Sequence, residues 1–533
     1  MNLDASSLPD NPDDLKEIIQ SLSMSYKNLE QNDEKKQARI DFLEERIRLL
    51  TNEIFGRKTE KLPQVDLKQL LLFNEDQQDA FEGSLPAEEV TIPKHTRKKR
   101  GRKPLPENLP RFEVVLDIKD EEKTCGCGSK LSHIGSDTSE KLEIIPAKVL
   151  VIRYIRKKYA CKSCEGVEDN GPTVKIAPLP PQIIPKSIAT AGLLAHIITS
   201  KFDYALPFYR QEKILHQMGI DLPRSTLCGW AIKVAERIEP LISLLHQDIR
   251  SGPLINIDET PVQVLKEPGR SNTGKSYMWV YRGGDPDQPS LIYQYQPTRS
   301  GQVPLSFLKG YQGYVQTDAY NGYEALGRQS GVDLVGCWAH ARRNFVKVIN
   351  AKSRKSKTGL ADIALKYIGK LYYIEKQARE KGLEPEEIYQ LRQEKAEPIL
   401  REFHKWLLSK LDLTPPKGLL GKAINYTLKY WERLIRYIED GQLRPDNNLA
   451  ENAIRPFVIG RKNWLFNGSP NGAEASSNLY SLVETAKANG LNPYEYFRYL
   501  LEKLPYAETK KDYKNLLPQN LDPADMKFDY PQV

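Results

Sequence analysis

The stretch "PLINIDETPVQV", residues 253–264, combines β-branched and apolar side chains with an acid, Asp258, near its centre. This composition is typical of a strand that is largely buried. Two more strand-like stretches follow, "YMWVYRGG" (277–284) and "SLIYQYQ" (290–296). Their order and short connections predict an antiparallel run, so we expect Asp258 to lie on the first strand of a sheet.

Helices alternate with strands beyond this point. "FLKGYQGYVQTDAYNGY" (307–323) predicts a short helix and a fourth strand that ends at Asp318, and "DLVGCWAHARRNF" (333–345) predicts a fifth strand that passes into a helix. Three antiparallel strands followed by alternating helices and strands is the order of a ribonuclease H-like fold. In such a sheet the first and fourth strands are neighbours, so Asp258 and Asp318 should lie close together.

A third acid is expected on a later helix, in "DNNLAENAIRPFVIGRKNWLF" (446–466). Asp446 or Asn447 would cap this helix and leave Glu451 about one turn inside it. Three carboxylates on neighbouring elements can hold two divalent cations, which activate the attacking oxygen and stabilise the leaving oxygen of a phosphoryl transfer. Each acid alone also fits an ordinary turn or surface position, and Glu259 and Asp446 are alternative carboxylates.

Between the second and third acids the sequence is mainly helical, as in "ALKYIGKLYYIEKQAREK" (364–381) and "LLGKAINYTLKYWERLIRYIED" (419–440), which predicts a helical insertion within the catalytic domain. Basic residues near the acids are candidates to hold DNA phosphates. They are Arg342, Arg343, Arg455, Arg461 and Lys462. His340 could hold a phosphate together with Arg342 and Arg343. For these three residues, the alternative is a role in packing or as surface charge.

The N-terminal region repeats apolar residues at heptad spacing. They are Leu15, Ile19, Leu22, Tyr26 and Leu29, then Ile40, Leu43, Ile47, Leu50 and Ile54. This pattern predicts a coiled coil through which the chain self-associates, and the alternative is one amphipathic helix packed on its own chain. Asp33 and Lys36 occupy seam positions in the middle, where the register weakens or polar residues set the alignment.

A linker without periodicity follows and ends in a run of bases. They are Arg97, Lys98, Lys99, Arg100, Arg102 and Lys103. The Arg-Gly-Arg core at 100–102 is similar to an AT-hook, which fits the narrow minor groove of A·T-rich DNA. A solvated charge run that makes nonspecific phosphate contacts is the alternative, and both interpretations indicate nucleic acid.

Two close cysteine pairs flank a strand-like stretch with alternating bases, and they predict a zinc ribbon-like module. The cysteines are Cys125, Cys127, Cys161 and Cys164. Four thiolates can close a tetrahedral zinc site that stabilises a domain with little core. The first pair is C-x-C instead of the usual C-x-x-C, so His133 is a possible substitute ligand, and four unrelated reduced cysteines are the alternative. Helical signals from 187 to 250 then suggest a helix-turn-helix, which the sequence does not distinguish from plain helix packing.

"GRSNTGKS", residues 269–276, matches the phosphate-loop pattern G-x-x-x-x-G-K-[ST]. That pattern cradles phosphates only where a strand enters the loop and a helix leaves it. Here a strand follows Ser276, so we interpret the segment as a hairpin connection. An ATP-driven machine that uses Lys275 is therefore disfavoured.

Composition limits the class of protein further. The chain has 533 residues and a net charge of +8, with 78 basic and 70 acidic residues, and this length predicts several domains. It contains no run of about 18 apolar residues, and residues 1–15 lack the features of a secretory leader. We therefore expect a soluble protein of the cytosol, with no membrane partner.

Nearly end to end, the chain resembles transposases of the insertion sequence 66 family, a group of DDE transposases. The resemblance rests on several long motifs in order: "LTNEIFGRKTEKL" (50–62), "IDETPVQV" (257–264), "TGKSYMWVYRGG" (273–284), "YVQTDAYNGYEAL" (314–326), "GCWAHARRNF" (336–345) and "DNNLAENAIRPFVIGRKNWLFNGSPNGAEASSNLYSLVETAKANGLNPYEYF" (446–497). It implies a leucine-zipper-like N-terminus, a zinc-binding module and a ribonuclease H-like catalytic domain with a helical insertion. The family's catalytic acids fall on Asp258, Asp318 and Glu451.

The predicted organisation is α+β and multidomain. It comprises a coiled coil at 1–62, a linker with the AT-hook-like segment at 63–110, a zinc-binding module at 111–175, a helix-turn-helix-like region at 176–250, a catalytic domain at 251–350 and 441–505 around an all-helical insertion at 351–440, and a tail at 506–533.

The resemblance also implies an activity, that of a polynucleotidyl transferase and DNA endonuclease. Mg²⁺- or Mn²⁺-dependent hydrolysis at the ends of a mobile element would free 3′-hydroxyl groups, which then attack target DNA. The implied partners are double-stranded DNA at the element ends and the target, further copies of the chain, and small accessory transposition proteins in the bacterial cytosol. Two alternatives stay open: a nuclease of the same fold that does not join strands, and a noncatalytic coiled-coil DNA-binding regulator.

Overall fold

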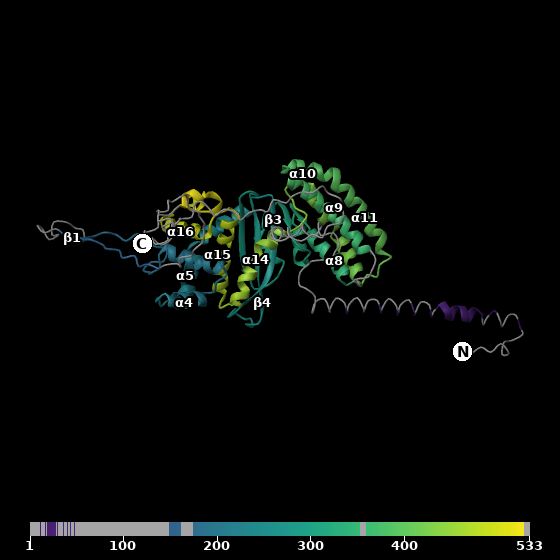
Figure 1. The fold of residues 1–533 in the computed structure, drawn as a ribbon, viewed down its shortest axis with the longest axis horizontal. Helices are drawn as coiled ribbons and strands as arrows, with labels where there is room; N and C mark the ends of the chain where they lie inside the picture. Colours follow the sequence, from purple (N-terminus) through teal and green to yellow (C-terminus); the bar gives the residue numbers. More distant parts are fainter. Residues whose placement is uncertain are drawn as a thin grey trace, which may run out of the picture. The chain divides into compact units, whose positions relative to one another are not determined.

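In this computed structural model, the described residues are 149–160, 174–351 and 359–526, together with isolated positions between 11 and 47 (Figure 1). The chain divides into two units, Met1–Asp76 with Pro178–Val533, and Gln77–Ala177. The four cysteines of the predicted zinc module, His133 and the bases between 97 and 103 all lie outside the described residues. In the smaller unit, β1 (Lys158–Ala160) pairs antiparallel with β2 (Val174–Ile176).

The described N-terminal positions from 16 to 47 are helical. Their apolar seam residues are exposed in the single chain, among them Ile19, Leu22, Leu29, Ile40, Leu43 and Ile47. A row of exposed apolar side chains at heptad spacing is the surface that a partner helix would cover.

The centre of the larger unit is a mixed sheet in the order β5-β4-β3-β6-β7. Its strands are β3 (Leu254–Val264), β4 (Lys275–Gly284), β5 (Pro289–Gln296), β6 (Gly313–Gln316) and β7 (Val332–Val335). The strands β3, β4 and β5 are antiparallel, whereas β6 is parallel to both β3 and β7. The predicted strands are therefore present in the predicted order, and β3 is central because hydrogen-bonded neighbours flank it on both sides.

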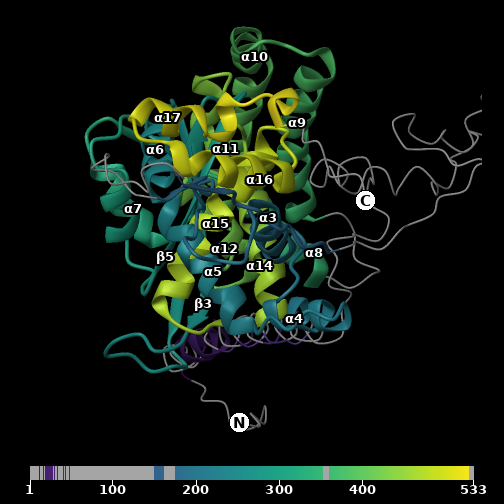
Figure 2. The ribbon, with the colours of Figure 1, turned by 90° about the vertical axis from the view of Figure 1, so that its left-hand side faces the viewer.

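Figure 1 shows this sheet between two groups of helices. One group contains α3 (Ala191–Phe202), α4 (Phe208–Gln217), α5 (Arg224–Arg237), α6 (Glu239–Ile249), α15 (Pro470–Ala488) and α16 (Pro493–Lys503). Figure 2 views the molecule from the side of this group, where α3, α15 and α16 lie together. Helices that precede the sheet in sequence and helices that follow α14 thus share one core.

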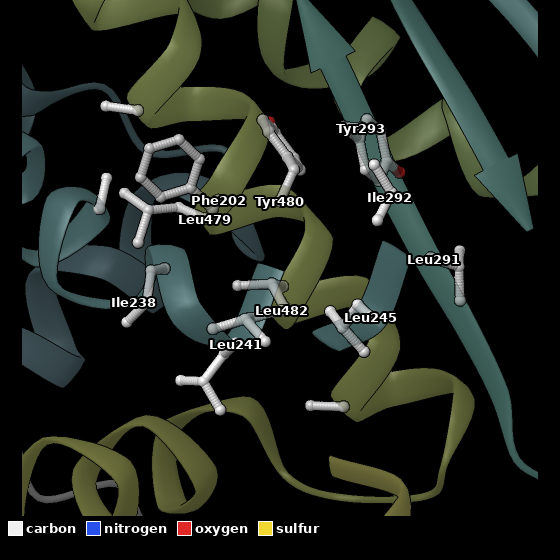
Figure 3. Packing of buried hydrophobic residues seen from close by; sticks show 14 of the residues in the cluster. Phe202, Ile238, Leu241, Leu245, Leu291, Ile292, Tyr293, Leu479, Tyr480 and Leu482 are labelled. Carbon is white, nitrogen blue, oxygen red and sulfur yellow. The ribbon is translucent and has the colours of Figure 1, made fainter. Parts of the chain in front are cut away.

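The helix α15 covers β5, the edge strand of the sheet, and Figure 3 shows the contact. Leu479 and Leu482 of α15 are fully buried in a cluster that also contains residues of β5, α3 and α6. The same helix also satisfies the main chain of the edge: Ser481 Oγ accepts the N–H of Tyr293 at 2.8 Å, and Thr485 Oγ1 accepts the N–H of Leu291 at 3.0 Å. An edge strand covered in this way is closed to pairing with another chain.

The second group of helices forms a separate hydrophobic core beside β7. It contains α8 (Trp338–Ala351), α9 (Leu360–Lys381), α10 (Pro385–Leu391), α11 (Glu397–Leu411), α12 (Leu419–Lys429) and α13 (Trp431–Ile435). A π-helical turn, Arg392–Ala396, precedes α11. These helices are thus inserted between β7 and the helix that carries Glu451.

The segment with the phosphate-loop pattern is the hairpin between β3 and β4, as predicted, because β4 already begins at Lys275. Arg270 fixes the turn by donating to Glu267 at 2.6 Å and to Ser276 Oγ at 2.8 Å. Within the helical region predicted from 187 to 250, α4 and α5 are consecutive helices, and the left-handed φ of +80° at Gly219 supports the turn between them. Their role in DNA binding stays a prediction.

Candidate active site

Asp258 and Asp318 are brought together by the pairing of β3 with β6. In this parallel pair Asn256 lies opposite Gln316, and each acid comes two residues further along its chain. Because parallel strands run in the same direction, both acids lie at the same end of the β3–β6 pair. Asp318 is the second residue after β6, which ends at Gln316, and its Oδ1 accepts the N–H of Tyr320 at 2.9 Å.

Glu451 reaches the same place from α14 (Asn448–Trp464). Its N–H donates to the carbonyl of Asn447, the N-cap residue, at 3.2 Å. Glu451 is therefore in the first turn, as predicted. The two proposed capping residues have different roles: Asp446 Oδ1 accepts the N–H of Asn448 at 3.2 Å, whereas the side chain of Asn447 makes no capping bond and points into the sheet.

A chain of three buried side-chain amides joins the elements that carry the acids. Asn256 Nδ2 donates to Gln316 Oε1 at 2.9 Å and to Asn447 Oδ1 at 3.0 Å. Asn447 Nδ2 donates to the carbonyl of Ile257 at 2.8 Å. All three amides are at most 2% exposed. The sequence pattern did not identify Asn256 and Gln316 as site residues and indicated Asn447 only as a possible helix cap, although polar residues two positions before Asp258 and Asp318 in otherwise apolar strands were a usable signal.

Like charges and burial act strongly on the acids. Burial raises the pKa of Asp258 to about 8, and the neighbouring carboxylates of Glu259, Glu451 and Asp318 add to this shift. Burial also raises the pKa of Glu451, against the opposing effect of Arg343. Burial and mutual repulsion both disfavour the ionised carboxylates. A bound divalent cation offsets both free-energy costs, so this arrangement favours cation binding.

The alternative carboxylates are engaged elsewhere. Glu259 forms an ion pair with Arg299, whose Nε donates to Oε1 at 2.6 Å, and Glu259 accepts a hydrogen bond from Tyr323 on its other oxygen. The Arg299 guanidinium lies 3.7 Å from the ring centroid of Tyr320. Asp446 accepts the N–H of Asn448 at the start of α14. Asp318 raises the pKa of both adjacent acids on β3, and Glu451 also raises that of Asp258. Because Glu259 is held by Arg299 and Tyr323, Asp258 is the stronger candidate of the two.

Two residues of α8 face the third acid. His340 Nδ1 lies 3.7 Å from Glu451 Oε1, and Arg343 Nη2 lies 3.8 Å from Glu451 Oε2. Burial lowers the pKa of His340, and Arg343 lowers it further, so the ring is neutral near pH 7. Arg342 is only 9% exposed, which favours its packing interpretation. Of these two arginines, Arg343 is the more exposed, and its phosphate contact stays a prediction.

The remaining predicted bases lie along α14. Arg455 and Lys462 are exposed. Arg461 donates from Nη1 to Thr260 Oγ1 at 3.1 Å and so ties the far part of the helix to β3, two residues beyond Asp258. Arg455 and Lys462 are therefore open to solvent, whereas Arg461 bridges α14 and β3.

The residues present fit a divalent cation. Glu451 Oε1 and His340 Nδ1 are both buried and have no hydrogen-bond partner among the described residues. Cys337, His340 and Glu451 offer ligand atoms within 4.8 Å of one another. Asp258 and Asp318 are not members of this cluster, but they interact electrostatically with Glu451, and their carboxylate oxygens are ligands that Mg²⁺ and Mn²⁺ prefer.

The chain matches family models of one class of protein, the DNA transposases. Residues 186–475 match the model of the Transposase IS66 family, and residues 481–519 match the IS66 C-terminal element. Residues 122–165 match the zinc-finger binding domain of transposase IS66, and residues 42–114 match a family described as Transposase C of IS166 homeodomain. The chain belongs to the IS66 family of transposases.

Its relatives include three uncharacterized proteins of Sinorhizobium fredii (strain NBRC 101917 / NGR234). The chain is 33% identical to protein y4jD over 523 residues, which cover 94% of this chain and 98% of the relative. It is 30% identical to y4hP, with 85% and 83% covered, and 30% identical to y4qI, with 81% and 79% covered. The likeness therefore extends over nearly the full length of each protein. Within the described residues, no helix is both long and apolar enough to span a membrane.

Proposed function

We propose that this transposase cuts DNA at the ends of a mobile element and joins the freed 3′-hydroxyl ends to target DNA, with Asp258, Asp318 and Glu451 as its catalytic acids. The observation that carries the proposal is the in-register parallel pairing of β3 with β6, which brings the first two acids side by side. The strand order, three antiparallel strands continued by two parallel ones, supports a ribonuclease H-like catalytic domain.

Asp258, Asp318 and Glu451 would hold the divalent cations, Mg²⁺ or Mn²⁺. When bound, such ions lower the pKa of an attacking hydroxyl and neutralise charge on the phosphate that is cut. The protein's own contribution is to fix the three carboxylates. The buried amides of Asn256 and Asn447 do this by hydrogen bonding, because groups held on rigid elements need no rearrangement during the reaction.

DNA would be held by exposed bases around the acids. Arg343 lies beside Glu451, and Arg455 and Lys462 are exposed along α14. The linker bases and a zinc module built on the four cysteines would add further contacts with DNA, in agreement with the match to a zinc-finger domain. The exposed apolar seam at 19–47 supports pairing between copies of the chain, so that two element ends can be held in one complex.

The closest rival is a nuclease of the same fold that cuts but does not join. A noncatalytic DNA-binding regulator is a weaker rival, because a regulator gives no reason to bury an Asp258 carboxylate beside two further acids at a free-energy cost. Joining of strands separates the transposase from the nuclease, and metal-dependent cutting separates both from the regulator.

The test is an assay of purified full-length protein on labelled duplexes that carry the ends of its own element, with Mg²⁺ or Mn²⁺ and a target plasmid. We expect cutting and strand joining by the native chain and neither by Asp258→Asn or Glu451→Gln. Asp287→Asn, a change in the exposed turn between β4 and β5, is the matched control and should behave as the native chain. Cutting without joining would support the nuclease.

A further inference from the structure

His340 and Glu451 face each other across a short gap. The His340 Nδ1 atom, at the start of α8, lies 3.7 Å from Glu451 Oε1 on α14. This separation is too long for a hydrogen bond. Both atoms are nevertheless buried, and neither has a hydrogen-bond partner among the described residues. Leaving two buried polar atoms unsatisfied is costly, and a third atom bound between them would remove that cost.

A metal ion satisfies both atoms at once. Imidazole nitrogens and carboxylate oxygens bind divalent ions at roughly 2.0–2.2 Å, and two ligand atoms at those distances from one ion lie about 3–4 Å apart. Arg343 already lies near the other carboxylate oxygen, Glu451 Oε2, at 3.8 Å, which leaves Oε1 for the ion. The Cys337 Sγ atom is also within 4.8 Å of these ligand atoms, but it accepts the N–H of Asn447 at 3.3 Å.

We propose that His340 Nδ1 and Glu451 Oε1 bind the same divalent cation, so that this cation has a nitrogen ligand in addition to carboxylate oxygens. The consequence is selectivity. Mg²⁺ prefers oxygen ligands, whereas Mn²⁺ and later first-row ions accept imidazole nitrogen more readily. The site at Glu451 therefore binds Mn²⁺ more tightly than Mg²⁺. The role of this ion in DNA cutting rests on the proposed function, but its ligands can be tested without any reaction.

The experiment is Mn²⁺ binding to the full-length, zinc-loaded protein, followed by electron paramagnetic resonance. Zinc is silent in this measurement and keeps the cysteine module filled. Pulsed spectra of the bound Mn²⁺ should show magnetic coupling to one ¹⁴N nucleus in the native protein. That coupling should vanish in His340→Ala, together with a loss of Mn²⁺ affinity of roughly 10-fold or more. His216→Ala, which removes an exposed histidine on α4, is the matched control and should keep both.

The outcomes separate this inference from the proposed function. Mn²⁺ that binds in a Glu451-dependent manner without ¹⁴N coupling would overturn the histidine ligand, leave the carboxylate site intact and indicate that His340 contacts water or phosphate instead. Failure to find any Glu451-dependent Mn²⁺ binding, with and without element-end DNA, would overturn both. The native spectrum does not depend on the folding of any variant, and His340→Gln with a melting curve checks that the affinity loss in His340→Ala is local.

Discussion

The side-chain amide of Asn447 donates a hydrogen bond to the main-chain carbonyl of Ile257, the residue directly before Asp258. A residue at the start of α14 thereby holds the strand that carries the first acid, and four positions later the same helix carries the third acid. The distance between these two acids is thus fixed by one buried amide instead of by the long intervening chain.

Asn447→Ala should therefore damage both stability and catalysis. It leaves the Ile257 carbonyl without its partner and removes one acceptor of Asn256, which together cost roughly 1–3 kcal/mol. The melting temperature should fall, and kcat for DNA cutting should fall further than the loss of folded protein explains. The matched control is Asn463→Ala, which removes a similar amide bond, to the carbonyl of Ala205 at 3.0 Å. It should lower the melting temperature while the folded fraction keeps its kcat, and equal kcat losses in the two variants would contradict the positioning role.

Asp258 should make stability depend on pH when no divalent cation is added. Its pKa rises from 3.8 in the unfolded chain to about 8 in the folded chain, so the folded chain binds the proton more tightly. This contribution to stability is complete below about pH 4 and is lost as the pH rises through about 8. In Asp258→Asn the loss is absent, and its melting temperature should exceed that of the native chain near pH 8.5, by roughly 2–4 °C for each kcal/mol recovered.

The difference between Asp258→Asn and the native chain should shrink near pH 5, where both side chains are neutral. It should also shrink when Mg²⁺ or Mn²⁺ is added at pH 8.5, because the cation stabilises the ionised carboxylate. Thermal melting in buffers from pH 5 to 8.5, with and without the ion, measures both effects. A native chain that is more stable than Asp258→Asn at pH 8.5 without metal would contradict the buried, repelled carboxylate.

The adjacent acids Asp258 and Glu259 should have separate functions. Glu259→Gln weakens the ion pair with Arg299 and the hydrogen bond from Tyr323, so we expect a loss of roughly 1–3 kcal/mol in stability with Mn²⁺ binding retained. Asp258→Asn should instead lose Mn²⁺ affinity and slow DNA cutting by roughly 10²–10³-fold, since an ion contributes several kcal/mol to the transition state. The reverse pattern would mean that Glu259 is the catalytic acid.

The sequence predicted the positions of the acids better than the way they are held. Alternation of apolar residues around Asp258 and the run ending at Asp318 locate their strands, because strand periodicity is a local property. The partner of a buried amide is not local: Asn256 and Asn447 are far apart in sequence, and no pattern near either one selects the other. For the same reason the sequence indicated Asn447 only as a possible helix cap and kept Glu259 as a reserve carboxylate, whereas in the structure Arg299 and Tyr323 bind Glu259.

Lys275→Ala should leave DNA cutting and joining nearly unchanged. Lys275 is the first residue of β4 and is exposed, and surface changes of this kind usually alter stability by less than about 0.5 kcal/mol. The assay of native and variant chains should be run with and without ATP. A requirement for ATP that disappears in Lys275→Ala would show that residues 269–276 bind nucleotide after all. Ser276→Ala is a useful contrast, because it removes the hydrogen bond from Arg270 and should destabilise the hairpin.

Arg392 should be a major determinant of how the helical insertion returns the chain to the active site. It is 2% exposed, and its guanidinium donates to both oxygens of Glu375 at 2.7 and 2.9 Å. It also donates to the carbonyls of Tyr437, Asp440 and Leu443 at 2.7–2.8 Å. These carbonyls belong to the segment that leads into α14, so the guanidinium holds that segment against the insertion.

Arg392→Met keeps much of the side-chain volume but leaves a largely buried carboxylate and three carbonyls without their donor. Breaking a buried ion pair from one side costs about 3–5 kcal/mol, so we expect a large drop in melting temperature. The double variant Arg392→Met with Glu375→Met should recover part of the loss, because the stranded charge is gone. The control is Arg401→Met on α11, whose exposed pair with Glu397 is worth only about 0.3–0.5 kcal/mol. Melting curves of equal midpoint for Arg392→Met and Arg401→Met would show that the buried guanidinium does not hold the returning segment in place.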